Sequence, residues 1–429
     1  MTPVLAASTI SEWLQTTQIP VIGPLTGWWP AVVAALIHVL LVAGFFGLPA
    51  GIFIWAERKV SARIQDRLGP TRVGGRFGWL QSLADGIKLL QKEDLAPDSA
   101  DKFLFRLAPY IVIVAAFSAF MFLPFTNGWM AVAMDCGLFV ALAVLSLEVL
   151  GVVIAGYASG SKWSLFGGMR EAAQMVSYEV PLGLTAVIPV VIAGTMNLND
   201  IGNMQQGWFL NWFMFHDPFA FIAFFVFFIA TLASNKRAPF DLAEAESELV
   251  AGFITEYSGF RWSLFFLGEY AAMFFVSALG TILFLGGWWT GIAPLDDWFV
   301  SIANSCWAGD YIIRVVGLKV FLLKSSLLVC VQIWVRWTLP RLRIDQVMTT
   351  CLKYLVPIAC FLFVGVVLYP LVLLTILGRT TLLHTEDGDK RSNAIGERVP
   401  VPVLKIEHEA ATSMVIPGSK ALVAQREER

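Results

Sequence analysis

The chain alternates between long apolar runs and polar segments, and this pattern predicts its fold. A helix needs about 20 consecutive, mostly apolar residues to cross a bilayer, and about eight runs reach that length. The runs show no strict alternation of apolar and polar positions, which favours helices over a β-barrel. We predict an all-α integral membrane protein with about eight transmembrane helices and long cytoplasmic loops that contain amphipathic helices. The expected spans are Pro30–Trp55, Leu107–Phe125, Trp129–Tyr157, Val176–Met196, Pro218–Ser234, Trp262–Trp288, Tyr311–Trp337 and Cys351–Leu377.

The composition agrees with a membrane protein and excludes several other classes. Of 429 residues, 57% are hydrophobic and only 14% are charged, whereas a soluble domain carries about a quarter charged residues. The mean hydropathy is +0.70. A soluble multidomain enzyme and a disordered scaffold are therefore excluded. The net charge of -2 argues against nucleic acid as a partner.

The cysteine and histidine residues do not form a pattern that holds a metal. The five cysteines contain no C-x-x-C pair, and the four histidines are scattered along the chain. These spacings argue against zinc, iron–sulfur and haem sites. We expect no metal and no redox cofactor on this chain, so any redox centre that it serves lies on another subunit.

The distribution of Lys and Arg between the spans predicts the orientation. Cytoplasmic connections carry an excess of positive charge, and here the odd-numbered connections are basic while the second, fourth and sixth contain no Lys or Arg. We expect an extracytoplasmic segment at 1–29, a membrane domain at 30–378 and a flexible extracytoplasmic extension at 379–429. The long cytoplasmic loops are 56–106 and 235–261.

The first of these loops contains an amphipathic segment. Trp79, Leu83 and Ile87 recur at helical spacing, while Asp85 and Lys88 lie on the opposite face. Such a helix can lie along the membrane surface. The alternative is a solvated helix in which Asp85 and Lys88 form an exposed pair with no further role.

The second loop is acidic. Asp241 suits a helix N-cap, with Glu244 three residues later as in a capping box. Capping does not explain Glu246, Glu248 or Glu256. Like-charged carboxylates near a membrane raise some pKa values by repulsion and desolvation, so such groups can exchange protons near neutral pH.

Several charged residues also fall inside the expected spans. Each is costly at bilayer depth unless it faces a cavity or a partner. Because acids outnumber bases, a buried proton or cation path is favoured over isolated structural pairs. The residues are Asp135, Glu148, Glu179, Glu269, Lys319 and Lys324.

Four stretches together resemble one family, the membrane subunit of respiratory complex I that is known as the first subunit in mitochondria and as the H subunit in bacteria. The resemblance covers about Pro30 to Leu377. The stretches are Glu57-Arg58-Lys59 through Leu83-Ala84-Asp85-Gly86-Ile87-Lys88 to Asp94, Gly156-Tyr157-Ala158-Ser159-Gly160-Ser161-Lys162 through Ser177-Tyr178-Glu179, Pro239-Phe240-Asp241 through Glu256-Tyr257-Ser258, and Pro340-Arg341-Leu342-Arg343-Ile344-Asp345-Gln346.

The resemblance implies a subunit of a proton-pumping NADH:quinone oxidoreductase in a bacterial plasma membrane. It implies a quinone chamber wall that includes Glu57, Arg58, Asp85, Lys88, Arg341 and Arg343. It also implies a proton path through Glu148, Glu179, Asp241, Glu244, Glu246, Glu248, Glu256 and Lys324, and it assigns no catalytic residue to the chain. Quinone would be the substrate, and NADH, FMN and iron–sulfur clusters would bind to partner subunits.

The expected partners are the hydrophilic quinone-site subunits, the antiporter-like membrane subunits and membrane lipid. The sequence departs from the family pattern at Ser234, where some members carry a glutamate, and at Lys236, which is an unusual cation there. An alternative function is the ion-translocating membrane anchor of a related hydrogenase-type complex. An independent transporter is disfavoured because no internal repeat is visible.

Overall fold

The structure is a computed structural model, and it describes residues 36, 40, 51–243, 246–305 and 309–377. The expected N-terminal segment 1–29, most of the first expected span, Glu244 and the extension 379–429 lie outside these residues. Their predicted roles and positions therefore stay predictions.

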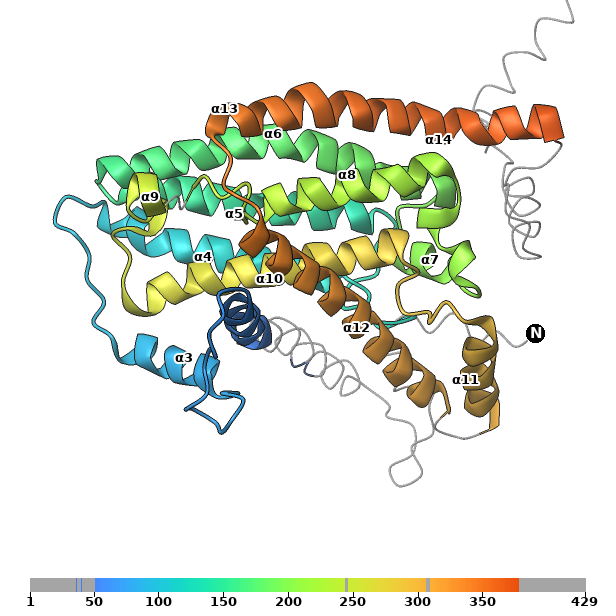
Figure 1. Cartoon of the computed structure of the whole chain (residues 1–429), viewed down its shortest axis with the longest axis horizontal. Helices are drawn as coiled ribbons and strands as arrows, with labels where there is room; N and C mark the ends of the chain where they lie inside the picture. Colours follow the sequence, from blue (N-terminus) through green and yellow to red (C-terminus); the bar gives the residue numbers. More distant parts are fainter. Residues whose placement is uncertain (1–35, 37–39, 41–50, 244–245, 306–308, 378–429) are drawn as a thin grey trace, which may run out of the picture. The chain divides into compact units, whose positions relative to one another are not determined.

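The described part of the chain is helical and contains no strand, apart from an isolated bridge between Thr126 and Trp129. This confirms the predicted all-α fold class. Residues 51–64 are also helical. The named elements (Figure 1) are α3 (Gln81–Gln91), α4 (Lys102–Ala119), η2 (Phe120–Phe122), α5 (Gly137–Ala158), α6 (Lys162–Ala193), α7 (Leu198–Asn203), η3 (Phe209–Asn211), η4 (Phe213–Phe215), α8 (Pro218–Ser234), α9 (Glu246–Leu249), η5 (Gly252–Ile254), α10 (Gly259–Phe284), α11 (Ala293–Ser305), α12 (Gly309–Thr338), α13 (Ile344–Thr349), η6 (Thr350–Leu355) and α14 (Val356–Leu377).

Five helical segments among the described residues are long and apolar enough to cross a membrane, and α8 is a shorter apolar helix. The helix α12 covers the seventh expected span but carries several charges. The predicted number of eight spans is therefore not confirmed. The five segments are Lys102–Phe122, Gly137–Ala158, Lys162–Ala193, Gly259–Phe284 and Ile344–Leu373.

Two helices begin far from the residues that hydropathy predicts. The helix α5 begins at Gly137 rather than Trp129, because the preceding segment turns back at the Thr126–Trp129 bridge. Asp135 consequently lies before the helix and is exposed, so its predicted place inside a span was wrong. The helix α6 begins at Lys162, well before Val176. Its first half is polar because inward-facing positions there carry small and polar side chains.

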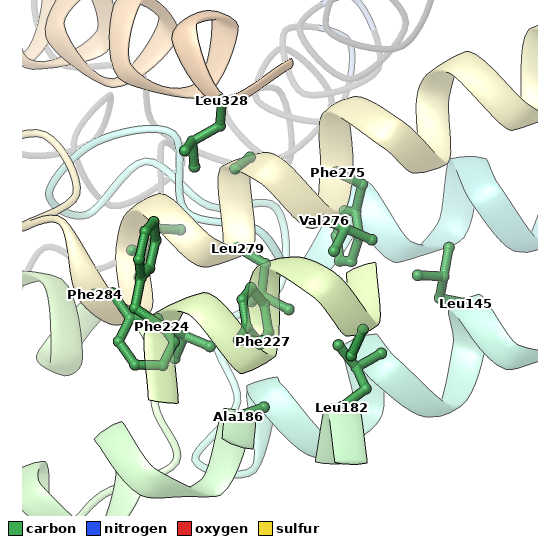
Figure 2. Close-up of a cluster of buried hydrophobic side chains, with 14 of the residues drawn as sticks. Leu145, Leu182, Ala186, Phe224, Phe227, Phe275, Val276, Leu279, Phe284 and Leu328 are labelled. Atoms are coloured by element: carbon green, nitrogen blue, oxygen red, sulfur yellow. The ribbon is translucent and has the colours of Figure 1, made fainter. Parts of the chain in front are cut away.

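The helix α10 lies at the centre of the packing. Nearly all of its residues from Leu264 to Phe284 are buried, and it contacts α3, α4, α6, α7, α8 and α12. Figure 2 shows Phe284 beside Phe224, and their rings meet edge to face with centroids 5.7 Å apart. A charged residue on α10 can therefore be satisfied only by other protein groups.

Glycines allow close approaches at the first half of α6. A Cβ on Gly156 of α5 would lie 2.6 Å from the Ser164 carbonyl oxygen, and one on Gly167 would lie 2.6 Å from the Phe253 backbone nitrogen. The segment that contains η5 therefore packs directly against α6. These contacts bring the acidic second loop next to the polar half of α6.

Candidate functional site

A group of charged side chains, three buried and one partly buried, meets where α8 ends. Arg237 is 2% exposed; its Nη1 lies 3.1 Å from Glu57 Oε2, and its Nε lies 2.8 Å from Glu269 Oε1. Arg336 and the Tyr270 hydroxyl both donate to the Glu57 carboxylate. The Arg237 guanidinium also lies 4.3 Å from the centre of the Tyr270 ring. We call Glu57, Arg237, Glu269 and Arg336 the central ion cluster.

A second group of charges adjoins the first. Lys236 Nζ donates to Glu148 Oε1 of α5 at 3.0 Å and lies 3.5 Å from Glu171 Oε1 of α6. All three side chains are buried. Burial lowers the pKa of Lys236, but the carboxylates of Glu148 and Glu171 outweigh it, so the pKa lies above its ordinary value. We call these three residues the Lys236 cluster.

The backbone after α8 explains why consecutive residues reach both clusters. Asn235 ends the helix, and Lys236 has a φ of 53°, a left-handed conformation that turns the chain sharply. Gln174 Nε2 donates to the carbonyl oxygens of Ala233 and Phe240 at 2.7 and 2.8 Å, which holds the loop against α6. Asn235 Nδ2 donates to Gln332 Oε1 of α12 at 2.9 Å. The loop is thus fixed on two sides.

Asp241 pairs with Arg341, whose Nη2 lies 2.7 Å from Asp241 Oδ2. The predicted N-cap role of Asp241 was wrong, because Leu242 and Ala243 are not helical and α9 begins only at Glu246. The Leu342 backbone nitrogen also donates to the Pro239 carbonyl oxygen at 2.9 Å. These contacts join the second loop to the segment after α12. Arg343 comes directly after Leu342 in that segment.

Glu248 differs from the buried acids. Its carboxylate accepts a hydrogen bond from Arg170 Nη1 at 2.6 Å and is about half exposed. This hydrogen bond holds the pKa of Glu248 below its ordinary value. Glu248 is therefore not one of the acids of this loop whose pKa is raised. Glu256 is partly buried, and Glu246 begins α9.

In the first loop, Arg58 donates to Asp85, and Lys88 Nζ lies 3.7 Å from the same carboxylate. The indole rings of Trp55 and Trp79, from the same loop and the helix before it, stack with centroids 4.2 Å apart. The helix α3 matches the predicted amphipathic segment and leaves Leu83, Ile87 and Leu90 exposed. The structure therefore brings Arg58, Asp85 and Lys88 together, whereas Glu57 belongs to the central ion cluster.

Glu179 adjoins the Lys236 cluster, whereas Lys324 lies outside both clusters. Glu179 lines a cavity of about 240 Å³ together with Glu148, Tyr178, Ser234 and Lys236. Lys324 Nζ donates to the carbonyl oxygens of Leu285 and Trp289, both at 2.6 Å, beyond the end of α10. It also lies 4.1 Å from the centre of the Trp212 ring.

Sequence reasoning missed several members of the two clusters. Glu171 lies in a segment whose low hydropathy marks it as a loop, and Arg336 lies near the end of an expected span. The sequence signals for the two clusters were the charges of Glu148 and Glu269 inside expected spans, Glu57 in a stretch that carries the resemblance, and the unusual Lys236. In the described part of the chain, no group of three or more His, Cys, Asp or Glu side chains is placed to hold a metal ion.

Comparison with known proteins identifies the family. The family model described as NADH dehydrogenase matches residues 36–367. The chain belongs to this family. The H subunit of NADH-quinone oxidoreductase from Anaeromyxobacter dehalogenans is 43% identical over 365 residues, which cover 84% of this chain and 85% of that protein.

Two further relatives carry the same name. The one from Chlorobaculum tepidum is 45% identical over 342 residues, covering 79% of this chain and 92% of that protein. The one from a Geobacillus species, strain WCH70, is 48% identical over 306 residues, covering 71% and 85%. The resemblance to the complex I membrane subunit is thereby confirmed, and the chain is a membrane subunit of this enzyme complex whose partners include other complex I subunits.

Proposed function

We propose that the chain forms part of the quinone-binding chamber of NADH-quinone oxidoreductase and the start of its proton-coupling path. The observation that carries the proposal is the position of two neighbouring residues. Glu57 enters the central ion cluster, whereas Arg58 faces Asp85 on α3. A change of charge beside Arg58 therefore occurs next to Glu57, which contacts the ionisable groups of the central ion cluster.

The first-loop site has the chemistry that a quinone head group needs. Ligand sites combine apolar and aromatic walls with a few polar groups. Trp55 and Trp79 offer flat apolar rings, and the partly exposed Arg58 and Lys88 offer donors for quinone carbonyl oxygens. Asp241 of the second loop pairs with Arg341 of the segment after α12, and we assign this pair and Arg343 to the same chamber wall.

The proton path would begin at the central ion cluster and continue through Glu148 and Glu179. Lys236 connects the two groups in sequence, since it precedes Arg237 and pairs with Glu148. Glu246, Glu248 and Glu256 would belong to its outer part. Lys324 donates to backbone carbonyl oxygens beyond the C-terminal end of α10, and it would belong to the part of the path at that end.

We place the chain in a bacterial plasma membrane, with residues 1–29 and 379–429 on the extracytoplasmic side. This orientation rests on the alternation of basic connections. NADH, FMN and the iron–sulfur clusters would bind to the hydrophilic partner subunits. Antiporter-like membrane subunits and lipid would contact the membrane part of the chain.

The proposal is tested with a photoreactive quinone analogue on the intact complex. Labelling of residues 57–93, suppressed by native quinone, is the expected result. In the Arg58→Met variant the KM for quinone should rise while NADH oxidation by an artificial acceptor is unchanged. Arg63→Met is the matched control because Arg63 is exposed. Labelling confined to other subunits, with a normal KM in Arg58→Met, would overturn the proposal.

A further inference from the structure

Glu171 is an acid that the proposed path does not contain, and its surroundings are unusual. It is fully buried on α6. Apart from Lys236, whose Nζ lies 3.5 Å from Oε1, no described residue donates a hydrogen bond to either carboxylate oxygen. Buried carboxylates are normally satisfied by several donors, and an ionised one without them is costly. The environment therefore favours a neutral acid at this place.

The Lys236 cluster has an excess of negative charge, whereas the charged groups around it are balanced. The central ion cluster contains two carboxylates and two guanidinium groups, so it is balanced. Asp241, which also faces Glu171, is paired with Arg341. The Lys236 cluster contains two carboxylates and one ammonium group. One carboxylate therefore has no counter-charge, and two carboxylates that share a buried site cannot both ionise easily.

We propose that Glu148 and Glu171 share one proton beside Lys236, so that the Lys236 cluster is a proton-holding station of this chain. This inference rests on the proposed function and adds Glu171 and Lys236 to its path.

The station has connections on two sides. The cavity of about 240 Å³ reaches Glu148 and Lys236 from the side of Glu179, whose Oε1 is itself buried without a hydrogen bond from the described residues. A smaller cavity of about 10 Å³ lies between Glu148, Lys236 and Glu269, which is near the lower limit for one water molecule. A proton can therefore pass between Glu269 of the central ion cluster and the cavity at Glu179 by way of the Lys236 cluster.

The proposed step moves only a proton. The proton joins or leaves the carboxylate pair as water or a neighbouring acid releases or accepts it, so charge is conserved and no bond between heavy atoms changes. The ionisable groups that face the pair are Lys236, Asp241 and Tyr178, and Glu269 faces Lys236. Lys236 keeps its charge throughout because it always has at least one ionised carboxylate beside it.

Infrared difference spectra of the purified complex in H2O and D2O test the station directly. The carbonyl band of a protonated carboxyl should be lost in Glu148→Gln and equally in Glu171→Gln, because either variant leaves one carboxylate paired with Lys236. Asp135→Asn, at an exposed position, should keep the band. A band that persists in both variants, or disappears in only one of them, overturns the proposal.

Assembly provides a second measurement. Each single variant leaves one carboxylate and one ammonium group, so complex content and thermal stability should stay near those of the parent. The double variant leaves Lys236 without either carboxylate and should lower complex content far more than the two single effects combined. Additive losses would overturn the shared-proton arrangement even if the single variants assembled poorly.

Proton translocation per NADH separates the station from the proposed function. It should fall to less than half of the parent's value in both single variants, while NADH oxidation by artificial acceptors is unchanged. Glu171→Asp should restore it in part. A lost infrared band with normal translocation would overturn the station's role in coupling and leave the proposed function intact. If the parent complex moved no protons during quinone reduction, the proposed function itself would fail.

Discussion

Lys236 and Arg237 are adjacent in the sequence, yet their side chains enter two different ion clusters. Lys236 pairs with Glu148 of α5, and Arg237 pairs with Glu57 and with Glu269 of α10. The left-handed conformation at Lys236 separates the two side chains. One short loop therefore links two groups of buried charge, and substitutions in and around it have separable expected effects.

Replacing Arg237 with Met should destabilise the subunit strongly. The change leaves Glu57 and Glu269 with Arg336 as the remaining cation of the central ion cluster. Removing one partner from a buried ion pair costs about 3–5 kcal/mol. Complex content and thermal unfolding of the purified complex measure the effect. Adding Glu269→Gln should recover part of the loss, and Arg63→Met at an exposed position should cause none; equal losses in all three variants would contradict the cluster's role.

Asp241→Asn should reduce stability more than Glu248→Gln. Asp241 is buried and paired with Arg341, whereas Glu248 is about half exposed beside Arg170. Exposed ion pairs contribute about 0–1 kcal/mol, while loss of a buried charged partner leaves an uncompensated group. Unfolding temperatures of the two variants at equal complex content decide the order. The reverse order would show that burial does not determine how much each ion pair stabilises the subunit.

The contribution of Glu248 to stability should disappear in acid. Its pKa is lowered below 4.5 by Arg170, so the carboxylate is more acidic in the folded state than in the unfolded state. The stabilisation is therefore complete above about pH 4.5 and is lost as the pH falls through the lowered pKa. The unfolding temperatures of the parent and Glu248→Gln should differ at neutral pH and converge in this acidic range. A constant difference across the range would refute the assignment.

Lys324→Met should loosen the end of α10. The ammonium group donates to two carbonyl oxygens there, and a hydrogen bond to a charged group contributes about 1.5–3 kcal/mol. Hydrogen–deuterium exchange of residues 281–291 should accelerate. Lys319→Met is the matched control, because Lys319 lies on the same helix and is exposed. If translocation falls in Lys324→Met without faster exchange, a role in the proton path is favoured over one in stabilising the helix end.

Gly167→Ala should disturb the contact between α6 and the second loop. The added Cβ would lie 2.6 Å from the Phe253 backbone nitrogen and 2.9 Å from the Ala243 carbonyl oxygen. Overpacking of this kind typically costs about 1–3 kcal/mol. Gly183→Ala on the same helix has no atom within 4 Å of the added Cβ and should be tolerated. Comparison of complex content in the two variants checks the prediction.

Hydropathy was sufficient to predict the helical class and most of the spans, because lipid-facing helices must be apolar over a fixed length. It placed the start of α6 too late, since Glu171 and Gln174 face inward and lower the local hydropathy. The amphipathic α3 was predicted because its periodicity is local. The clusters depend on pairs far apart in the sequence, such as Arg336 and Glu57, which are separated by 279 residues. No local pattern contains that information.

The pairing of Arg237 with Glu269 has a consequence for how the chain is inserted into the membrane. Glu269 lies well inside α10, and a lone acid there raises the free energy of inserting a helix by about 2.5–3.5 kcal/mol. Its counter-charge is on the segment made just before α10, so it is already present when that helix leaves the translocon. The order of synthesis thus delivers the cation before the acid, so Arg237 can neutralise Glu269 as α10 enters the bilayer.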